Sequence, residues 1–159
     1  MRVLLIRHGE AVDGRTVADP LRHLTERGRR SAKEVGHAIL ERGLRPGVLL
    51  CSPYVRAVQT AEILAAAFGY GSTIPVTDHL RPGATTARAL ALLEPYERGR
   101  LVVMVSHEPT LSGMARFLAG RPDLLAFRTA EARLLETDAG EPGRLVARLD
   151  PASLDWQEE

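Results

Sequence analysis

The sequence predicts an α/β protein, with three layers, a mostly parallel central sheet and helices on both faces. Short runs of branched apolar residues, typical of strands, alternate along the chain with longer segments of helical periodicity. The chain has 159 residues, of which 45% are hydrophobic, enough to bury a core. At roughly 150 residues per domain, we expect one domain over residues 1–150 and a C-terminal tail over residues 151–159.

Four segments are expected to be strands of this sheet: residues 3–6, 48–51, 73–76 and 101–105. The first, second and fourth are continuous apolar runs, as expected for strands that are covered on both faces. Two further strands are predicted near the C-terminus.

Residues 131–137 and 144–149 predict a closing pair of strands around the glycines at positions 140 and 143. The tail that follows is expected to be loose, apart from Trp156. The sheet should therefore end before residue 150.

Helices are expected between the strands. Thr25 is a suitable N-cap, and the apolar residues after it fall at the spacing of one helix face. Ser52 and Pro53 predict the start of a second helix, with an N-cap followed by proline at the first helical position. Weaker helical patterns cover residues 87–93 and 110–118.

Charge and composition exclude several classes of protein. The chain has 21 basic and 20 acidic residues, so it lacks the basic excess of a protein that binds nucleic acid through phosphate contacts. Its apolar stretches are shorter than the ~18 residues of a membrane span, and its apolar start ends at Arg7. A single cysteine fits a reducing compartment. We expect a cytoplasmic protein that binds neither nucleic acid nor membranes.

Basic side chains follow three of the predicted strands. Arg7 and His8 come after the first, Arg56 follows the second at the start of a helix, and His107 comes after residues 101–105. Ligands of open α/β sheets bind outside the carboxyl ends of the strands, so these four side chains are expected to converge. Two guanidiniums and two imidazoles suit an anion with several oxygens, such as a phosphoryl group.

Each of these residues also has a simpler explanation. Arg7 and His8 fit a surface turn, Arg56 fits a solvated helix position, and His107 fits a loop. A metal site formed by the two histidines and Cys51 is the main chemical alternative. The neighbouring arginines would repel a cation, and no carboxylate cluster is evident, so we expect neither a metal nor a cofactor.

Three motifs resemble those of the histidine phosphatase superfamily, and within it the SixA-type phosphohistidine phosphatases. They are Arg-His-Gly at residues 7–9, Ser-Pro-x-x-Arg-Ala-x-Gln-Thr at residues 52–60, and Ser-His at residues 106–107. The segment at residues 22–28 matches a further family pattern, although His23 replaces its proline. The resemblance covers nearly the whole chain and implies a short phosphoglycerate mutase-like fold without lid insertions.

The resemblance also implies roles for individual residues. His8 would attack phosphorus and become a transient phosphohistidine, and Gly9 would let the backbone approach the substrate. Arg7 and Arg56 would hold the phosphoryl oxygens, and a protonated His107 would complete the pocket. Arg22 is a further candidate for a substrate contact. No metal is implied, since these side chains already supply the cationic groups.

One departure from related branches bears on the substrate. The glutamate general acid of phosphoglycerate mutase-like members is missing near Pro82, and Glu108 stands where acid phosphatases carry aspartate. An alkoxide leaving group needs a strong proton donor, whereas an imidazole is expelled more easily, so the missing acid favours a P–N bond. Asp13, Asp19 and His79 remain alternative proton donors, together with Glu108.

We therefore expect an enzyme that removes phosphate from phosphohistidine on a phosphotransfer domain and releases inorganic phosphate. The few residues between the motifs predict an open pocket, which suits a phosphorylated protein side chain. Two alternatives remain: a phosphatase of small phosphate esters, and a non-catalytic module that binds phosphorylated partners.

Overall fold

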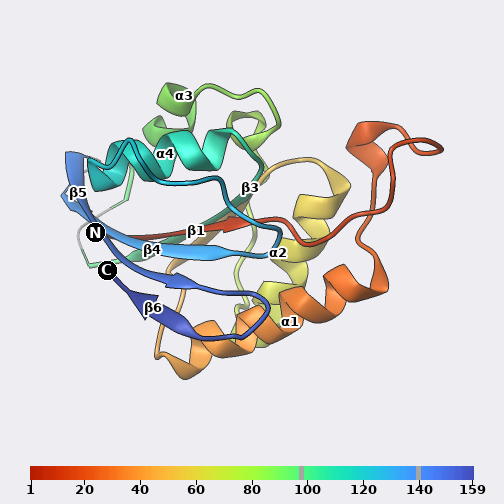
Figure 1. Cartoon of the computed structure of the whole chain (residues 1–159), viewed down its shortest axis with the longest axis horizontal. Coiled ribbons are helices and arrows are strands. Elements are labelled where there is room, and N and C mark those ends of the chain that lie inside the picture. The colour runs from red at the N-terminus through yellow and green to blue at the C-terminus, as the bar shows by residue number, and fades with distance from the viewer. Residues whose placement is uncertain (97–98, 139–140) are drawn as a thin grey trace.

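A six-stranded sheet separates two pairs of helices in the computed structural model, which describes residues 1–96, 99–138 and 141–159 (Figure 1). The strands are β1 (Arg2–Arg7), β2 (Val48–Cys51), β3 (Leu101–Ser106), β4 (Ala132–Asp138), β5 (Glu141–Leu149) and β6 (Trp156–Glu158). The helices are α1 (Glu26–Glu41), α2 (Val55–Phe68), α3 (Thr86–Ala91) and α4 (Thr110–Ala119), with 3-10 turns at Asp19–Leu21 and Asp78–Leu80. The predicted three-layer α/β class is confirmed.

The strand order is β2-β3-β1-β4-β5-β6, which places β1 inside the sheet. β1 and β2 both run parallel to β3, whereas β4, β5 and β6 are joined by antiparallel pairings. The sheet is therefore mixed, and the prediction that it is mostly parallel is wrong, because the closing strands extend the sheet beyond β1 through antiparallel pairings. Arg7 at the end of β1 is in register with Ser106 at the end of β3. The parallel half therefore brings the residues after β1, β2 and β3 to one edge.

The core lies on both faces of β1, because alternate side chains of a strand point to opposite faces. Leu4 and Ile6 pack with residues of α1 and α2, whereas Val3 and Leu5 pack with residues of α3 and α4. All four are fully buried. Burial of such side chains contributes about 1.5–3 kcal/mol each, which makes β1 a rigid support for the residues that follow it.

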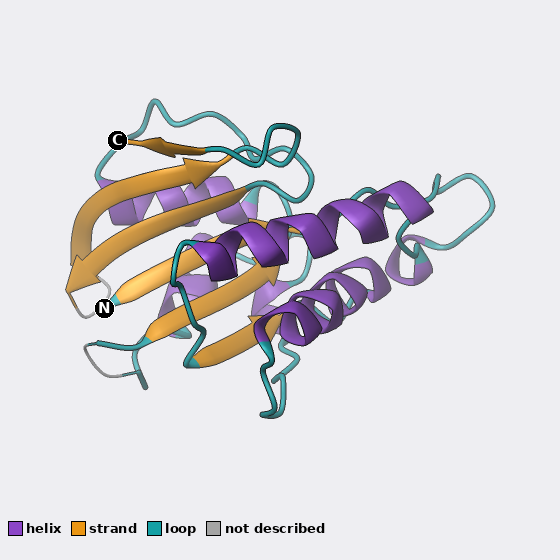
Figure 2. Cartoon of the chain, turned by 90° about the horizontal axis from the view of Figure 1, so that it is seen from below, coloured by secondary structure: helices purple, strands orange, loops and turns teal. Residues whose placement is uncertain are grey.

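α1 lies beside α2 on one face of the sheet and is the longest helix described, with 16 residues (Figure 2). Its Thr25 N-cap is confirmed, since Thr25 Oγ1 accepts a hydrogen bond from Gly28 N at 3.0 Å. Its outer face is charged and exposed, with Arg27, Arg30 and Glu34 among its residues. Over the described residues, no helix is both long and apolar enough to cross a membrane.

A predicted strand and the predicted start of a helix are wrong in the first part of the chain. Residues 73–76 form no strand, and only Val76 makes an isolated bridge with Cys51. Pro75 has no N–H to donate to a strand ladder, and three of these four residues are exposed. α2 begins at Val55 rather than after Ser52, whose hydroxyl instead accepts a hydrogen bond from Tyr54 N.

The C-terminal residues are more ordered than expected. β6 pairs with β5 through Trp156 and Leu149, and the Arg42 guanidinium lies 4.6 Å from the centre of the Trp156 ring. This packing overturns the prediction of a loose tail. β4 and β5 form the expected closing pair, but β5 begins at Glu141, so Gly143 lies in the strand rather than between the two strands as predicted. Position 140 lies outside the described residues.

Candidate active site

Arg7, His8, Arg56 and His107 line one pocket of about 250 Å³ at the carboxyl ends of the parallel strands. The ring centres of His8 and His107 are 5.0 Å apart, and Arg56 Nε lies 3.2 Å from His8 Nε2. The other lining residues are Glu10, Ala11, Arg22, Pro82, Glu108 and Thr129. The structure thus brings together the four side chains that the strand ends carry.

Two hydrogen bonds hold the His8 ring in one neutral tautomer. Its Nδ1 lies 2.7 Å from the Gly9 carbonyl oxygen, which can only accept, so Nδ1 carries the hydrogen. The Arg56 Nε–H can only donate, so Nε2 offers it a lone pair. The nitrogen with the free electron pair therefore faces the guanidinium of Arg56.

Burial keeps His8 neutral at physiological pH. The side chain is 7% exposed, and burial lowers the pKa of His8 to about 4. The charges of Arg56 and Arg7 act in the same direction, while the hydrogen bond to Gly9 opposes the shift only in part. His8 Nε2 is consequently available as a nucleophile over the whole neutral range.

His107 is neutral as well, contrary to the expectation that it is protonated. Burial, followed by the proximity of His8 and Arg56, lowers the pKa of His107 to about 3. Its Nε2 lies 2.7 Å from Ser52 Oγ, which accepts from Tyr54 N and so keeps its own hydrogen for the imidazole. The position of Ser52 before α2 therefore serves to hold His107 rather than to cap the helix.

Arg56 is nearly buried and is fixed by the backbone and by a carboxylate. Its Nη1 donates to the Asp19 carbonyl oxygen at 2.7 Å, and its Nη2 lies 3.5 Å from the Asp19 carboxylate. The guanidinium also lies 5.1 Å from the centre of the Tyr54 ring. These contacts fix the direction of the Nε–H that meets His8.

Arg7 is held from the opposite wall. Its Nη1 donates to the Phe127 carbonyl oxygen at 2.7 Å, and Phe127 N donates to Glu108 Oε1 at 3.1 Å. The other Glu108 oxygen accepts from the Ser112 hydroxyl. Arg7 Nε and His107 Nδ1 are buried and have no hydrogen-bond partner among the described residues. Both atoms belong to residues that line the pocket, and within the described part of the chain neither has the partner that a buried polar group usually has.

Gly9 is not among the residues that line the pocket, but it lets the loop after β1 pack tightly. Its N–H donates to Thr60 Oγ1 at 3.0 Å, and the Thr60 hydroxyl donates to the Arg56 carbonyl oxygen at 2.7 Å. A Cβ at Gly9 would lie 2.9 Å from the Gly28 carbonyl oxygen, and a Cβ at Gly28 would collide with the Glu10 carbonyl. The loop and the first turn of α1 therefore meet through two glycines.

The remaining candidates differ in position. Arg22 lines the pocket and is held by the Val12 carbonyl, to which its Nε donates at 2.7 Å. Among the proposed proton donors, Glu108 lines the pocket, whereas Asp13 is exposed and paired with Arg15.

Asp19 and His79 are poorly placed to give up a proton. The pKa of Asp19 is lowered, which favours its anion. Partial burial alone would raise this pKa, but the hydrogen bond from Arg22 and the charge of Arg56 outweigh it. His79 is exposed and lies outside the lining of the pocket.

Cys51, the third ligand of the alternative metal site, is buried in β2, and burial raises the pKa of its thiol to about 11. Across residues 1–96, 99–138 and 141–159, no group of three or more His, Cys, Asp or Glu side chains is placed to hold a metal ion.

Sequence reasoning missed the supports of the pocket. The carbonyl oxygens of Asp19 and Phe127 hold the two arginines, and backbone atoms leave no residue-type signal. Thr60 was visible only as the last residue of a motif, without a role. Its position one turn after Arg56 on a helix was the available signal, since residues four apart share a face.

The chain is similar in sequence to one protein family and to part of a known phosphatase. Residues 3–84 match the sequence profile of the histidine phosphatase superfamily, branch 1. A mitochondrial serine/threonine-protein phosphatase, Pgam5 of Drosophila persimilis, is 42% identical over 84 residues, which are 52% of this chain. The match spans only 28% of the Pgam5 chain, so it concerns one part of that protein.

Two solved structures of similar size share the fold. The protein histidine phosphatase SixA, complexed with tungstate, has a TM-score of 0.87 at 24% identity and covers 98% of this chain and 100% of its own. The putative phosphohistidine phosphatase SixA from Agrobacterium tumefaciens has a TM-score of 0.82 at 27% identity, covering 94% and 97%. The similarity therefore extends over the whole architecture.

Proposed function

The chain belongs to the histidine phosphatase superfamily, branch 1, and we propose that it is a phosphatase in which His8 carries the phosphoryl group transiently. The observation that supports this most directly is the state of the His8 ring. The imidazole is neutral and its Nε2 lone pair accepts the Arg56 Nε–H, so a phosphoryl oxygen that takes over this donor leaves the lone pair free to attack phosphorus.

In the proposed reaction, His8 Nε2 forms a bond to phosphorus while the bond to the leaving group breaks. The leaving group keeps that electron pair, and water then cleaves the His8–phosphorus bond to release inorganic phosphate. Arg7 and Arg56 bind the non-bridging oxygens and offset their charge. Arg7 Nε and His107 Nδ1 would gain oxygen partners that the protein does not provide among the described residues.

The substrate that we propose is phosphohistidine on a protein, such as a phosphotransfer domain. The full-length similarity to the Agrobacterium SixA protein supports this substrate. The pocket adds a chemical reason, since both oxygens of Glu108 already accept hydrogen bonds, from Ser112 and from Phe127. Both carboxylate oxygens of Glu108 are thus engaged by the protein itself, and an easily expelled imidazole has less need of a strong acid.

A phosphate ester on a protein is the second candidate. The match to Pgam5, a serine/threonine-protein phosphatase, favours it, as does the position of Glu108 in the wall of the pocket. Comparison of phosphohistidine with phosphoserine turnover by the same preparation separates the two substrates.

The test uses a histidine phosphotransfer domain carrying radiolabelled phosphate. We expect the wild-type protein to release the label as inorganic phosphate, and His8→Ala to be slower by about 10³-fold or more, because the nucleophile is lost. His79→Ala removes an exposed histidine outside the pocket and serves as the matched control. Release of label by His8→Ala at the wild-type rate would contradict the proposal.

A further inference from the structure

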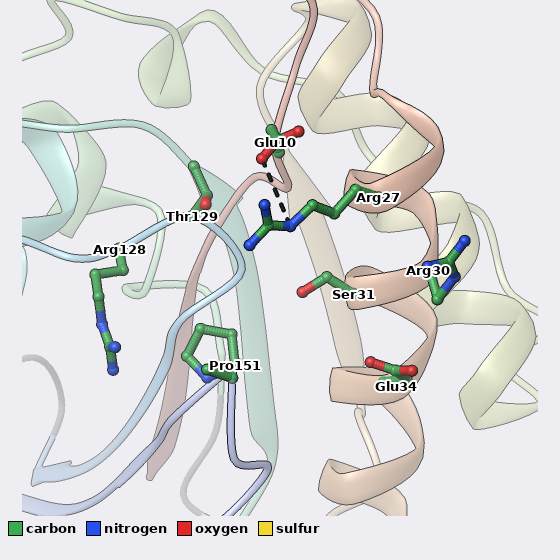
Figure 3. Close-up of a pocket in the computed structure, with 9 residues that line it drawn as sticks. Glu10, Arg27, Arg30, Ser31, Glu34, Arg128, Thr129 and Pro151 are labelled. Atoms are coloured by element: carbon green, nitrogen blue, oxygen red, sulfur yellow. Dashed lines mark ion pairs between the residues drawn. The ribbon is translucent and has the colours of Figure 1, made fainter.

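A second and larger pocket lies beside the proposed phosphoryl pocket. It has a volume of about 500 Å³ and lies between α1 and the loops that contain Thr129 and Pro151 (Figure 3). Glu10 and Thr129 line both pockets. We call this larger pocket the outer groove. The complete lining is Glu10, Arg27, Arg30, Ser31, Glu34, Arg128, Thr129, Pro151 and Ala152.

The shared residues place the outer groove next to any group bound in the phosphoryl pocket. A phosphoryl group attached to a protein side chain leaves the rest of that side chain outside the small inner pocket. Arg128 on one wall is already paired with Asp150 at 2.9 Å, and seven of the nine lining residues are polar or charged. The groove therefore suits a polar leaving group rather than an apolar one.

Glu10 is the acidic group at the junction of the two pockets. Its Oε1 accepts a hydrogen bond from the Thr25 hydroxyl at 3.0 Å, which fixes the side chain beside the N-terminus of α1. Its Oε2 lies 3.9 Å from Arg27 Nε, too far for a hydrogen bond, and Figure 3 shows this pair facing each other across the groove. With 46% of the side chain exposed, Oε2 can accept a hydrogen bond from a ligand.

We propose that the outer groove is the leaving-group subsite and that Glu10 accepts a hydrogen bond from the ring nitrogen of phosphohistidine that does not carry phosphorus. This inference rests on the proposed function and specifies how the same site recognises its substrate. Glu10 is the residue that distinguishes an imidazole leaving group, which has a second ring nitrogen, from a phenolate or alkoxide, which has none.

The chemistry explains why a carboxylate suits this position. When the second nitrogen takes a proton from solvent, cleavage of the nitrogen–phosphorus bond returns the electron pair to the ring, and neutral imidazole departs. Without that proton the ring would have to leave as an anion. The Glu10 carboxylate favours the protonated ring through charge and hydrogen bonding, and the proton stays on the departing imidazole.

The test is Glu10→Gln, because glutamine keeps an oxygen for Thr25 and removes the charge. The two substrates are a peptide whose single histidine has been phosphorylated with phosphoramidate, and p-nitrophenyl phosphate. We expect kcat/KM for the phosphohistidine peptide to fall about tenfold more than that for p-nitrophenyl phosphate. The decline of peptide turnover with rising pH should also begin at a lower pH in the variant, because the leaving ring loses its carboxylate partner.

Glu41→Gln is the matched control, since Glu41 is exposed at the other end of α1, about 22 Å along the helix axis from its start. It should leave the ratio of the two kcat/KM values unchanged. An equal effect of Glu10→Gln on both substrates, or no effect on either, would overturn the role of Glu10 and leave the proposed function intact. A wild-type protein that turns over p-nitrophenyl phosphate but not the peptide would instead overturn the proposed phosphohistidine substrate.

Discussion

The phosphoryl pocket and the outer groove share two residues but are built in opposite ways. In the pocket, the guanidiniums of Arg7 and Arg56 are held by backbone carbonyls, and both imidazoles are buried and neutral. In the groove, Arg27 is 84% exposed and its nearest carboxylate oxygen, on Glu10, is 3.9 Å away. The side chains of the pocket are thus fixed in the free protein, whereas Arg27 of the groove makes no hydrogen bond with Glu10.

The difference has an energetic basis. An exposed ion pair contributes about 0–1 kcal/mol, so the groove can exchange partners at little cost. A buried guanidinium left without partners is far more costly, so each arginine of the pocket is bound to the backbone in the free protein. We therefore expect changes in the pocket to have larger effects than changes in the groove.

Among substitutions that keep His8, the largest effect is expected for Arg56→Lys, which keeps the charge but removes the Nε–H that meets His8. A lysine ammonium cannot contact both His8 and the Asp19 carbonyl with the geometry of a guanidinium. We expect kcat/KM to fall about 10²–10³-fold, which corresponds to about 2.7–4 kcal/mol. Steady-state kinetics with Arg29→Lys, an exposed position on α1, provides the control. A loss of less than about threefold would show that charge alone suffices.

The next effect is acid destabilisation by the buried imidazoles. His8 and His107 have folded pKa values of about 4 and about 3 against an ordinary value of 6.5, so below pH 6.5 the unfolded chain binds protons that the folded protein excludes. Stability is therefore lost as pH falls through this window, by about 3 kcal/mol between pH 6.5 and about pH 5 for the two together.

Urea unfolding at several pH values measures this loss. His8→Gln should remove roughly half of the pH dependence, because one of the two imidazoles is gone. Identical pH dependence in the variant and the wild type would show that His8 does not contribute to the acid sensitivity.

The smallest effect is expected for Thr60→Val, which preserves shape and removes a hydroxyl. Gly9 N would then be buried without its acceptor, which costs about 1–3 kcal/mol, and the loop carrying His8 would be less firmly placed. We expect kcat to fall about tenfold with KM nearly unchanged, as measured beside urea unfolding. Thr73→Val, at an exposed position, is the control. An unchanged kcat would mean that the backbone positions His8 without Thr60.

The sequence predicted the convergence of the basic residues better than it predicted their state. The end of a buried strand can be located in the sequence where its apolar run stops, and neighbouring parallel strands end at one edge of the sheet. The placement of His8, Arg56 and His107 followed from these two rules. The charge of His107 did not, because its pKa depends on burial that no local pattern reveals. The expectation that Ser52 caps a helix failed because α2 begins only at Val55, so the Ser52 hydroxyl accepts from Tyr54 N in the turn before the helix.

The outer groove was beyond sequence reasoning for a related reason. Its walls come from α1 and from residues 128–129 and 151–152, which are about a hundred residues apart and carry no shared motif. Residues after 150 were expected to be loose, so no wall was anticipated there. The tail is ordered because β6 pairs with β5, and the composition of the tail did not predict this pairing.

The contact between Gly9 and Gly28 has a mechanical consequence. At these two glycines the first turn of α1 and the loop that carries His8 meet through backbone atoms. Thr25 N adds a direct hydrogen bond to the Glu10 carbonyl oxygen at 3.0 Å. We therefore expect a displacement of the start of α1 to shift the His8 side chain as well.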